Sequence, residues 1–455
     1  MKSIDTEKYK VGIRNNPAYR KASEYSVRML AASSLFSDSD KKILSHYLYT
    51  WAPVLTEYTM WVLKNARKRG FKKLYFLSRD AYPMYLIAEK INRENIELHY
   101  LRVSRYSLRI PEILLKKDDF LDYLFLSGID VTIRKIWQRG ALTEDEAIEA
   151  SKIIGFEGQT DEILTRPEIM RWKKRAQQHK EILWEMVKKH AEKQMPYVLG
   201  YLRQEGVFDD KRKAVVDSGW IGTTQQSLIN LMYHAGAVSG LEGYYFGLYE
   251  IPHAADPTNY HTFYFSPGKD IRKKVLFSNC LFEAVSSEPA GMTLEYRMND
   301  EGRYEALLSE DGSLNDGFLK RANEALEIYA EAFCKYSGDD NGTFVTDHIL
   351  QRLMAYPDKW EADIYGRLYF CDDVVEDGRQ HIAYDLSYKD ICNLRLFRKA
   401  FIWLMSRAGR KTDTIHESGW IYGSIVNSGI NVRWSLLSAR LYQWVMYVRK
   451  SIGTR

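Results

Sequence analysis

The segment KAVVDSGWIGTTQQSL occupies residues 213–228 and combines three local patterns. Residues 213–217 form a short apolar run that ends in an acid, which is typical of a buried strand. A glycine-bearing turn follows, and from about 223 to 235 the apolar spacing is helical. In open parallel sheets, ligands bind where a strand ends and a helix begins. The segment therefore predicts a binding loop at the end of a strand.

The flanking sequence predicts the remainder of a sheet. Upstream, a strand at 72–77, a helix at 81–92 and a second strand at 96–103 follow one another as in a βαβ unit. Downstream, strand character returns at 241–250 and 261–267. We therefore expect an α/β fold with one mostly parallel sheet.

Long helical patterns interrupt and follow this sheet, and they divide the chain into four expected parts. The parts are the N-terminal helices with the first half of the sheet (1–104), a large helical insertion (105–207), the second half of the sheet with the glycine-bearing loop (208–310) and a helical C-terminal region (311–455).

Composition limits the functions that the chain can have. Its 65 basic and 60 acidic residues give a net charge of only +5, which argues against a dedicated nucleic-acid binder. No apolar run approaches the ~20 residues of a membrane helix, and no apolar signal-peptide core is evident. The four cysteines form no CxxC pair, which is typical of a reducing compartment. We therefore expect a cytoplasmic protein without nucleic-acid partners.

The loop that follows residue 217 has the composition of a phosphate cradle. Glycine allows close backbone approach, while backbone N–H groups, hydroxyls and the positive end of the next helix can bind phosphate oxygens. The acid before the glycines suits sugar hydroxyls or magnesium. The cradle and the acid together therefore fit a phosphorylated sugar. The segment matches neither a Walker loop nor a GxGxxG fingerprint. The predicted residues are Asp217, Ser218, Gly219, Gly222, Thr223 and Thr224.

A second loop carries a cation and an acid at the tip of the first predicted strand. It contains Ser78, Arg79 and Asp80. Arg79 can bind a second phosphate or a diphosphate, and Asp80 can hold Mg²⁺ directly or through water. Arg105, which follows the next strand, is a candidate for the same anion. A surface salt bridge is the alternative for each arginine, and the preferred one for Arg102 and Arg109.

Together the two loops resemble those of the phosphoribosyltransferase fold. The resemblance places Asp217 on the acid that contacts the ribose hydroxyls, and Gly222, Thr223 and Thr224 on the 5-phosphate cradle. It implies phosphoribosyl diphosphate as donor and a phosphoribosyltransferase-like sheet. Ser218 departs from the pattern, because the family has a second acid there.

A wider set of motifs is similar to a bacterial polysaccharide-locus family whose members often carry a haloacid-dehalogenase-like label. The motifs are FLSRDAYP, YLRVSRYSLRIP, VVDSGWIGTTQQSL, FEAVSSEPAGMTLEY and GWIYGS. The resemblance implies a ribofuranosyl 5-phosphate transferase for O-antigen or capsule. Its acceptor would be a glycan or lipid-linked glycan, its product a β-riboside, and a separate haloacid-dehalogenase-type phosphatase would remove the 5-phosphate. Such an enzyme would work in the cytoplasm or at the inner face of the membrane.

The catalytic candidates are three carboxylates: Asp217 and Asp80, which also form the expected Mg²⁺ site, and Glu283. For Glu283, a carboxylate that only ends a helix is the alternative.

Two other classes of protein remain to be weighed. A haloacid-dehalogenase hydrolase needs a second aspartate two residues after its nucleophile, but Tyr82 follows Asp80 and Gly219 follows Asp217 at that spacing. This reading is disfavoured. The other alternative is a non-catalytic scaffold of a glycan-assembly complex, which Ser218 would suit.

Two C-terminal segments offer further alternatives. Residues 416–424 are expected to form a turn that packs on the sheet domain, with Trp420 as an acceptor platform in the alternative. An apolar stripe at helical spacing is expected to pack in the core. Docking at a membrane surface is the alternative, because cations accompany the stripe. The stripe contains Leu437, Leu441, Trp444, Val445 and Val448, and the cations are Arg433, Arg440, Arg449 and Lys450.

Overall fold

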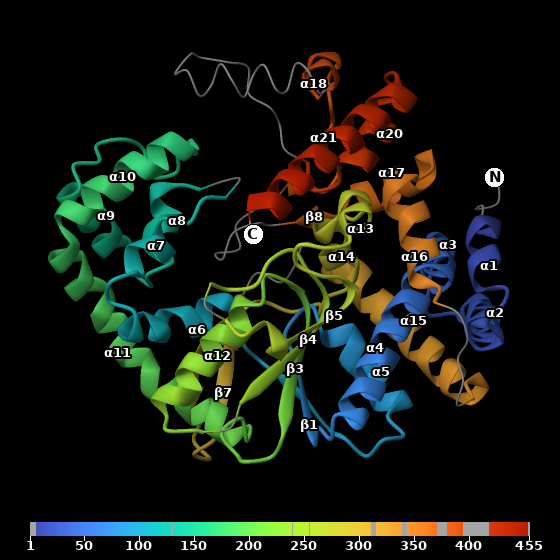
Figure 1. The fold of residues 1–455 in the computed structure, drawn as a ribbon, viewed down its shortest axis with the longest axis horizontal. Helices are drawn as coiled ribbons and strands as arrows, with labels where there is room; N and C mark the ends of the chain where they lie inside the picture. Colours follow the sequence, from blue (N-terminus) through green and yellow to red (C-terminus); the bar gives the residue numbers. More distant parts are fainter. Residues whose placement is uncertain are drawn as a thin grey trace.

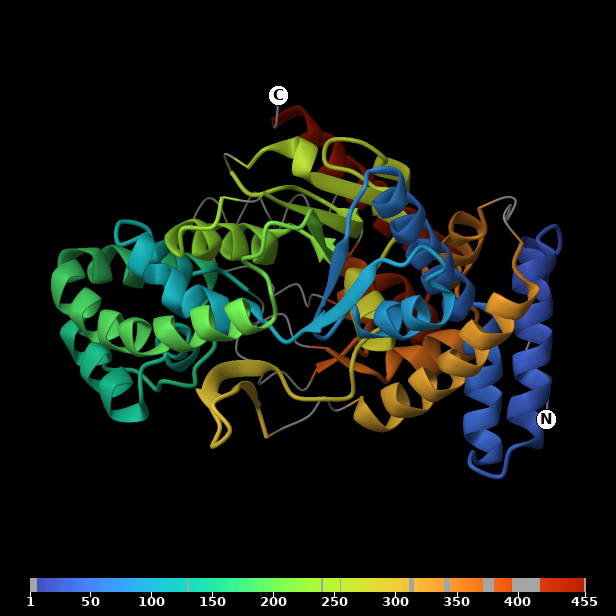
Figure 2. The same ribbon diagram turned by 90° about the horizontal axis from the view of Figure 1, so that it is seen from below.

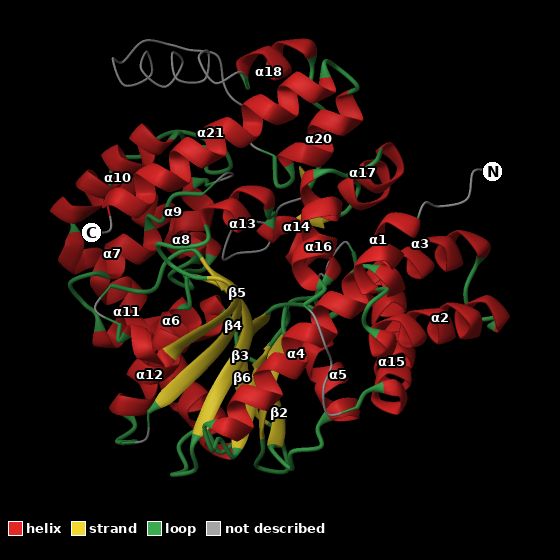
Figure 3. Cartoon of the chain, turned by 45° about the vertical axis from the view of Figure 1, so that its right-hand side comes forward, coloured by secondary structure: helices red, strands yellow, loops and turns green. Residues whose placement is uncertain are grey.

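A five-stranded parallel sheet lies at the centre of the molecule (Figures 1 and 3). The computed structural model describes residues 6–128, 131–238, 240–253, 255–310, 315–338, 344–370, 380–394 and 418–453. The strands are β1 (Lys73–Leu77), β2 (Glu97–Leu101), β3 (Lys213–Trp220), β4 (Leu241–Leu248) and β5 (Tyr260–Phe265). Their order is β2-β1-β3-β4-β5, and every neighbouring pair is parallel. The prediction of an α/β fold with a parallel sheet is confirmed.

Both faces of the sheet are buried, which explains why its strands read as continuous apolar runs. On one face, Leu74, Phe76 and Val216 belong to the largest core cluster. On the other face, Tyr75 and Val215 belong to a second cluster. Alternate residues of each strand therefore serve different cores.

Helices from distant parts of the chain cover the first face. They come from the segments before β1 and after β1, and from the C-terminal region. The helices of these segments are α1 (Glu7–Ile13), α2 (Pro17–Ala32), α3 (Asp38–Tyr49), α4 (Trp51–Lys68), α5 (Tyr82–Ile91) and α15 (Asp316–Tyr336).

The insertion between β2 and β3 is helical, as predicted, and projects to one side of the sheet (Figure 2). Its outer helices enclose a separate hydrophobic core, whereas α6 and α11 cover the second face of the sheet with α12 (Thr223–His234). The insertion contains α6 (Arg105–Glu112), the 3₁₀ turn Ile113–Leu115, α7 (Phe120–Leu124), α8 (Ile133–Gln138), α9 (Glu144–Ile153), α10 (Arg166–Gln178) and α11 (Lys180–Gln204).

The chain after β5 is largely helical in its described parts, as expected, but it also contains strands that were not predicted. An antiparallel hairpin, β6 with β7, packs against α11. A second, very small pair joins β8 to β9. Residues 395–417 of the region expected to be helical lie outside the described residues. The remaining elements are α13 (Ile271–Leu276), α14 (Asn279–Val285), β6 (Thr293–Met298), β7 (Tyr304–Leu308), α16 (Thr346–Leu350), the π-helical turn Gln351–Ala355, α17 (Lys359–Gly366), β8 (Tyr369–Phe370), β9 (Gln380–His381), α18 (Tyr388–Asn393), α20 (Ile421–Ser428) and α21 (Val432–Gly453).

In the C-terminal region the structure excludes one alternative and corrects one expectation. Trp420 is only 1% exposed and its indole N–H donates to the Met354 carbonyl, so it packs in the core and offers no platform to a ligand. The apolar stripe of α21 is largely exposed, with Leu441 at 49%, so the prediction that it packs in the core is wrong. Among the described helices, none has the length and apolar character to cross a bilayer.

Candidate functional site

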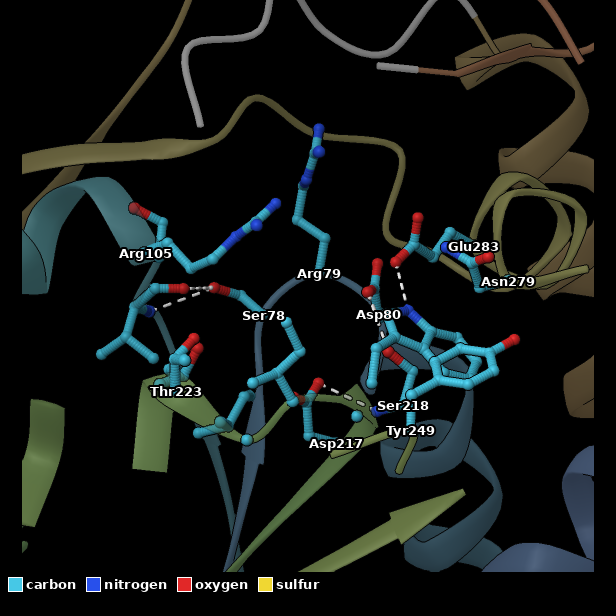
Figure 4. Close-up of a pocket in the computed structure, with 18 of the residues that line it drawn as sticks. Ser78, Arg79, Asp80, Arg105, Asp217, Ser218, Thr223, Tyr249, Asn279 and Glu283 are labelled. Atoms are coloured by element: carbon cyan, nitrogen blue, oxygen red, sulfur yellow. Dashed lines mark hydrogen bonds between the residues drawn. The ribbon is translucent and has the colours of Figure 1, made fainter. Parts of the chain in front are cut away.

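A pocket of about 430 Å³ opens at the carboxyl ends of β1 and β3 (Figure 4). The chain runs from β1 to β2 on one side and β3 lies on the other, so the pocket occupies the point where the strand order reverses, which is where ligands bind in such sheets. The pocket brings together every residue predicted for the site: Ser78, Arg79, Asp80, Arg105, Asp217, Ser218, Gly219, Gly222, Thr223, Thr224 and Glu283.

The loop after β1 is tied to the loop after β2. The Ser78 hydroxyl donates to the Val103 carbonyl at 2.8 Å and accepts from the Val103 N–H at 3.1 Å. The peptide bond between Ser78 and Arg79 is cis. These contacts fix the first loop to the sheet at the rim of the pocket.

A segment of the FEAVSSEPAGMTLEY motif, for which no contact with this loop was predicted, holds the loop in place. The Arg79 guanidinium donates to the Ala290 carbonyl, and the Arg79 carbonyl accepts from the Glu288 N–H at 3.1 Å. The Glu288 carboxylate in turn accepts two hydrogen bonds from Arg102 and one from Tyr100. Arg102 therefore forms a salt bridge, as preferred, but its partner is buried and not at the surface. Glu288 positions the loop without lining the pocket.

The loop after β3 begins later than predicted. Residues 218–220 still belong to the strand, because Gly219 and Trp220 pair with Gly247 and Leu248 of β4. At Gly219, φ is +116° and a Cβ atom would lie 2.4 Å from the Gly247 carbonyl oxygen, so only glycine fits. The turn into α12 is formed by residues 221 and 222 alone.

The N-terminus of α12 presents unsatisfied donors to the pocket. Gly222 is the N-cap residue with φ +73°, and no acid lies in the first turn. Within the described chain, the backbone N–H groups and the hydroxyls of Thr223 and Thr224 make no hydrogen bond. Gln225 anchors the turn, since its side chain bonds the carbonyls of Leu241 and Asn259. A preformed helix end with free donors is suited to an anion such as phosphate.

Two carboxylates lie at the floor of the pocket with Ser218 between them. The Ser218 hydroxyl donates to Asp80 at 3.0 Å, and the Ser218 N–H donates to Asp217 at 2.9 Å. Burial, and then the negative charge of Asp80, raise the pKa of the Asp217 carboxyl to about 7, against the effects of the Ser218 N–H and Arg105. Tyr58 of α4 fixes the strand end, because its hydroxyl lies 2.8 Å from the Asp217 carbonyl oxygen.

This carboxylate pair can be compared with the needs of magnesium. Among the described residues, no three His, Cys, Asp or Glu side chains form a metal-binding group. Mg²⁺, however, is commonly held by one or two carboxylates and completes its shell with water and substrate phosphates. The repulsion between Asp80 and Asp217 would be relieved by such a cation. The two residues therefore fit a Mg²⁺ that is shared with a phosphorylated ligand.

Arg105 and Arg109 differ in their surroundings, although both lie on α6. Arg105 is exposed at the pocket rim, and its side chain makes no hydrogen bond or ion pair within the described residues (Figure 4). Arg109 lies 3.6 Å from Glu112 and over the Tyr123 ring. Arg105 is thus available to an anionic ligand, and Arg109 has a structural role, as preferred.

The wall opposite α12 comes from α14 and α21. On α14, the Glu283 carboxylate accepts from the Trp220 indole N–H at 2.5 Å, and Asn279 lies one turn earlier. Tyr447 of α21 stacks on Tyr249, with ring centroids 5.8 Å apart. Tyr447 and Lys450 line the pocket but were not predicted, because no local pattern links the end of the chain to β3.

Thr293, at the start of β6, is a further pocket residue; it lies within the motif FEAVSSEPAGMTLEY but was not among the predicted site residues. It is 2% exposed, it lines the pocket, and its hydroxyl oxygen has no hydrogen-bond partner within the described chain. A buried hydroxyl without a partner is costly, so this position is suited to a polar group of a ligand.

No family model matches the sequence, and a search of curated proteins gives no significant match. The geometry itself defines an α/β protein with a polar pocket at the carboxyl edge of its sheet. One side of that pocket offers anion-binding donors and the other side offers carboxylates.

Proposed function

We propose that this chain is a phosphoribosyltransferase-type glycosyltransferase. It would move ribofuranose 5-phosphate from phosphoribosyl diphosphate to a sugar hydroxyl during synthesis of a bacterial surface polysaccharide. The observation that carries the proposal is that two loops, far apart in sequence and each suited to one end of this donor, line one pocket. A volume of about 430 Å³ lies within the ordinary range for small-molecule sites.

The donor has one natural orientation in this pocket. Its 5-phosphate would bind the free donors of Gly222, Thr223 and Thr224 at the start of α12. The ribose hydroxyls would then lie on Asp217. The diphosphate would extend to the loop after β1 and to Arg105, whose guanidinium can bind two phosphate oxygens at once.

Mg²⁺ would be held by Asp80 and Asp217 together with the donor, and when bound it supplies positive charge that offsets the charge of the departing diphosphate. Ser218 keeps Asp80 and Asp217 in place through its hydroxyl and its N–H. A serine instead of the second acid seen in the resembling family is thus compatible with donor binding.

The reaction exchanges one bond at the anomeric carbon for another. The bond from C1 to the diphosphate oxygen breaks, and its electron pair leaves with diphosphate. The acceptor hydroxyl oxygen bonds to C1 from the opposite face, and its proton passes to a carboxylate. Attack opposite an α-linked leaving group gives a β-riboside. Arg105 and the residue 78–80 loop would stabilise the negative charge that develops on the diphosphate.

Glu283 is our choice for the carboxylate that accepts this proton. Asp217 and Asp80 lie on the donor side and share Ser218, whereas Glu283 lies on α14 in the opposite wall. The Trp220 indole N–H orients one carboxylate oxygen of Glu283. The product keeps its 5-phosphate. Since Tyr82 and Gly219 stand where a haloacid-dehalogenase phosphatase needs its second aspartate, a separate phosphatase would remove that group.

The first experiment measures thermal stabilisation by phosphoribosyl diphosphate with Mg²⁺, in parallel with UDP-sugars. A ligand at a hundred times its dissociation constant stabilises the folded state by roughly 2.7 kcal/mol. We expect a rise in melting temperature with phosphoribosyl diphosphate and Mg²⁺, and none with UDP-sugars. The Thr223→Val and Asp217→Ala variants should lose this rise. Thr165→Val, at the N-cap of α10, is the control: it should cost about 1 kcal/mol of stability and keep the ligand shift.

Other outcomes would replace the proposal. A shift with UDP-sugars but none with phosphoribosyl diphosphate would indicate an ordinary nucleotide-sugar transferase. No shift with either would favour a scaffold protein.

A further inference from the structure

We infer that α21 docks this protein onto the surface of an anionic lipid bilayer. The helix carries an apolar stripe formed by Trp434, Leu437, Leu441, Trp444, Val445 and Val448. At 3.6 residues per turn, these positions fall within an arc of about 100° on one side of the helix. The five most exposed members are between 44% (Trp444) and 76% (Trp434) exposed, which is unusual for so many large apolar side chains together.

The rest of α21 is fixed to the molecule, so the stripe is a rigid surface. Ser435 and Ala439 are buried on the opposite side. The Tyr422 hydroxyl of α20 donates to Gln443 at 2.5 Å, and Tyr447 stacks on Tyr249. Figure 1 shows α21 as a long helix above α13. The helix therefore has an inner side that packs and an outer side that remains apolar.

The positive charge around the stripe favours an anionic membrane as the binding partner. Residues 432–453 contain no acid, and Arg433 and Arg449 lie at the borders of the stripe, whereas Arg440 donates to the Ala355 carbonyl and Lys450 lines the pocket. The adjacent α13 adds Arg272 and Lys273. A helix with tryptophan and leucine on one side and Lys/Arg at its borders is the type that lies in the interface of an anionic membrane. Two copies meeting stripe to stripe would bring both sets of cations together, which argues against a dimer.

The helix that carries the stripe also forms part of the pocket wall. Tyr447 and Lys450, on the same helix, line the pocket. A protein docked through α21 would hold its pocket next to lipid headgroups. This consequence, unlike the docking itself, rests on the proposed function: the acceptor sugar would then be carried on a membrane lipid.

The test is flotation of the full-length protein with two kinds of vesicle. One is phosphatidylcholine alone, and the other is an equal mixture of phosphatidylcholine and phosphatidylglycerol. We expect partition to the anionic vesicles, weaker at high salt. Leu441→Glu should reduce that partition about ten-fold or more, because one buried leucine contributes enough for such a factor. Arg433→Glu should reduce it several-fold. Leu35→Glu, at an exposed leucine between α2 and α3, is the matched control and should bind as the original protein does.

Three results would overturn the inference. They are no binding to anionic vesicles, binding that Leu441→Glu leaves unchanged, and a stable dimer in sedimentation that Leu441→Glu dissociates. Leu441 does not line the pocket, so Leu441→Glu should keep the thermal shift with phosphoribosyl diphosphate. Vesicle binding without that shift would leave the docking standing and remove the proposed function. A thermal shift with phosphoribosyl diphosphate but no vesicle binding would leave the proposed function standing and remove the docking.

Discussion

At the scale of single residues, Asp217 is well placed to contact a ligand, but its negative charge lowers the stability of the ligand-free protein. It lies at the end of the buried part of β3, close enough to Asp80 for their charges to interact, and burial raises the pKa of its carboxyl to about 7. A carboxylate held in this way costs stability until a cation or a hydroxyl donor compensates its charge.

We therefore expect Asp217→Asn to stabilise the ligand-free protein at pH 8 while it abolishes the thermal shift with phosphoribosyl diphosphate. The side chain keeps its size and loses the disfavoured charge. The gain should be about 1–2 kcal/mol, allowing for solvent at a half-buried position. Urea unfolding without Mg²⁺ measures it.

Asp209→Asn is the control, because its effect on the free energy of unfolding should have the opposite sign. Asp209 is paired with Lys73 and Lys213, and hydrogen bonds from both lysines, against the effect of burial, lower the pKa of its carboxyl. Its replacement should destabilise the protein. If Asp217→Asn destabilised it by a similar amount, Asp217 would be a structural residue.

The residues of the site were predictable where the signal is local. Asp217, Gly222 and Thr223 stand within one strand-turn-helix segment, and the change in hydrophobic period marks their place. Residues 218–220 were placed in the loop because a glycine there suggests a turn, whereas Gly219 lets β3 approach β4 closely. Thr293 and Tyr447 reach the pocket only through tertiary packing, which no local pattern encodes.

At the scale of elements, the segment between α14 and β6 acts as a brace for the loop after β1. Its Glu288 is 6% exposed and is held by Arg102 and Tyr100, while its backbone holds Arg79. The brace therefore connects β2, the first loop and the β6–β7 hairpin.

Glu288→Gln should weaken the brace and, through it, donor binding. Arg102 would lose its carboxylate partner at a partly exposed position, so we expect a loss of about 1–2 kcal/mol in the free energy of unfolding. The dissociation constant of phosphoribosyl diphosphate should rise several-fold, as measured by calorimetry. Glu295→Gln, exposed on β6, should change stability by less than about 0.5 kcal/mol and leave binding alone. Unchanged donor binding in Glu288→Gln would show that the brace does not position the loop.

Two elements, the β6–β7 hairpin and α21, were not predicted correctly from sequence patterns. The β6–β7 hairpin has alternating side chains and a turn with Gly302 at φ +74°, so a signal was present, although no strand was predicted there. The stripe of α21 has helical spacing whether it faces a core or solvent. Periodicity identifies an apolar face, but only the packing of other elements decides whether that face is covered.

At the scale of the whole molecule, a buried polar cluster joins the N-terminal helices to α17 in the C-terminal region. The Glu361 carboxylate of α17 accepts hydrogen bonds from Lys8 at 2.6 Å and Tyr9 at 2.5 Å in α1, and lies 2.9 Å from a ring nitrogen of His46 in α3. Burial favours the protonated form, yet His46 and Lys8 hold the pKa of the Glu361 carboxyl below its ordinary value.

The lowered pKa of Glu361 determines how the stability of the folded state changes with pH. A lowered pKa in the folded state stabilises the protein above the unfolded-state value of about 4.3, and that contribution is lost as pH falls through the folded-state value. Glu361→Gln should cost about 3 kcal/mol at pH 7. The difference from the original protein should stay level down to pH 5 and shrink below about pH 4. Glu7→Gln, 75% exposed, should show almost no difference. Urea unfolding at several pH values measures both, and a cost for Glu361→Gln that stays constant at acid pH would contradict the assignment.

The separate core of the insertion also bears on the order in which the chain folds. β1 pairs with β3 across a long stretch of intervening sequence, and closing a loop costs more conformational entropy as the loop lengthens. The outer helices of the insertion have a core of their own, and α6 packs on α11 near the two ends of the insertion. An insertion that folds first would thus bring its ends together before β3 is added. During synthesis it leaves the ribosome ahead of β3. The carboxyl edge of the sheet, and the pocket with it, would then be completed only after the insertion has folded, when β3 pairs with β1 and β4 follows.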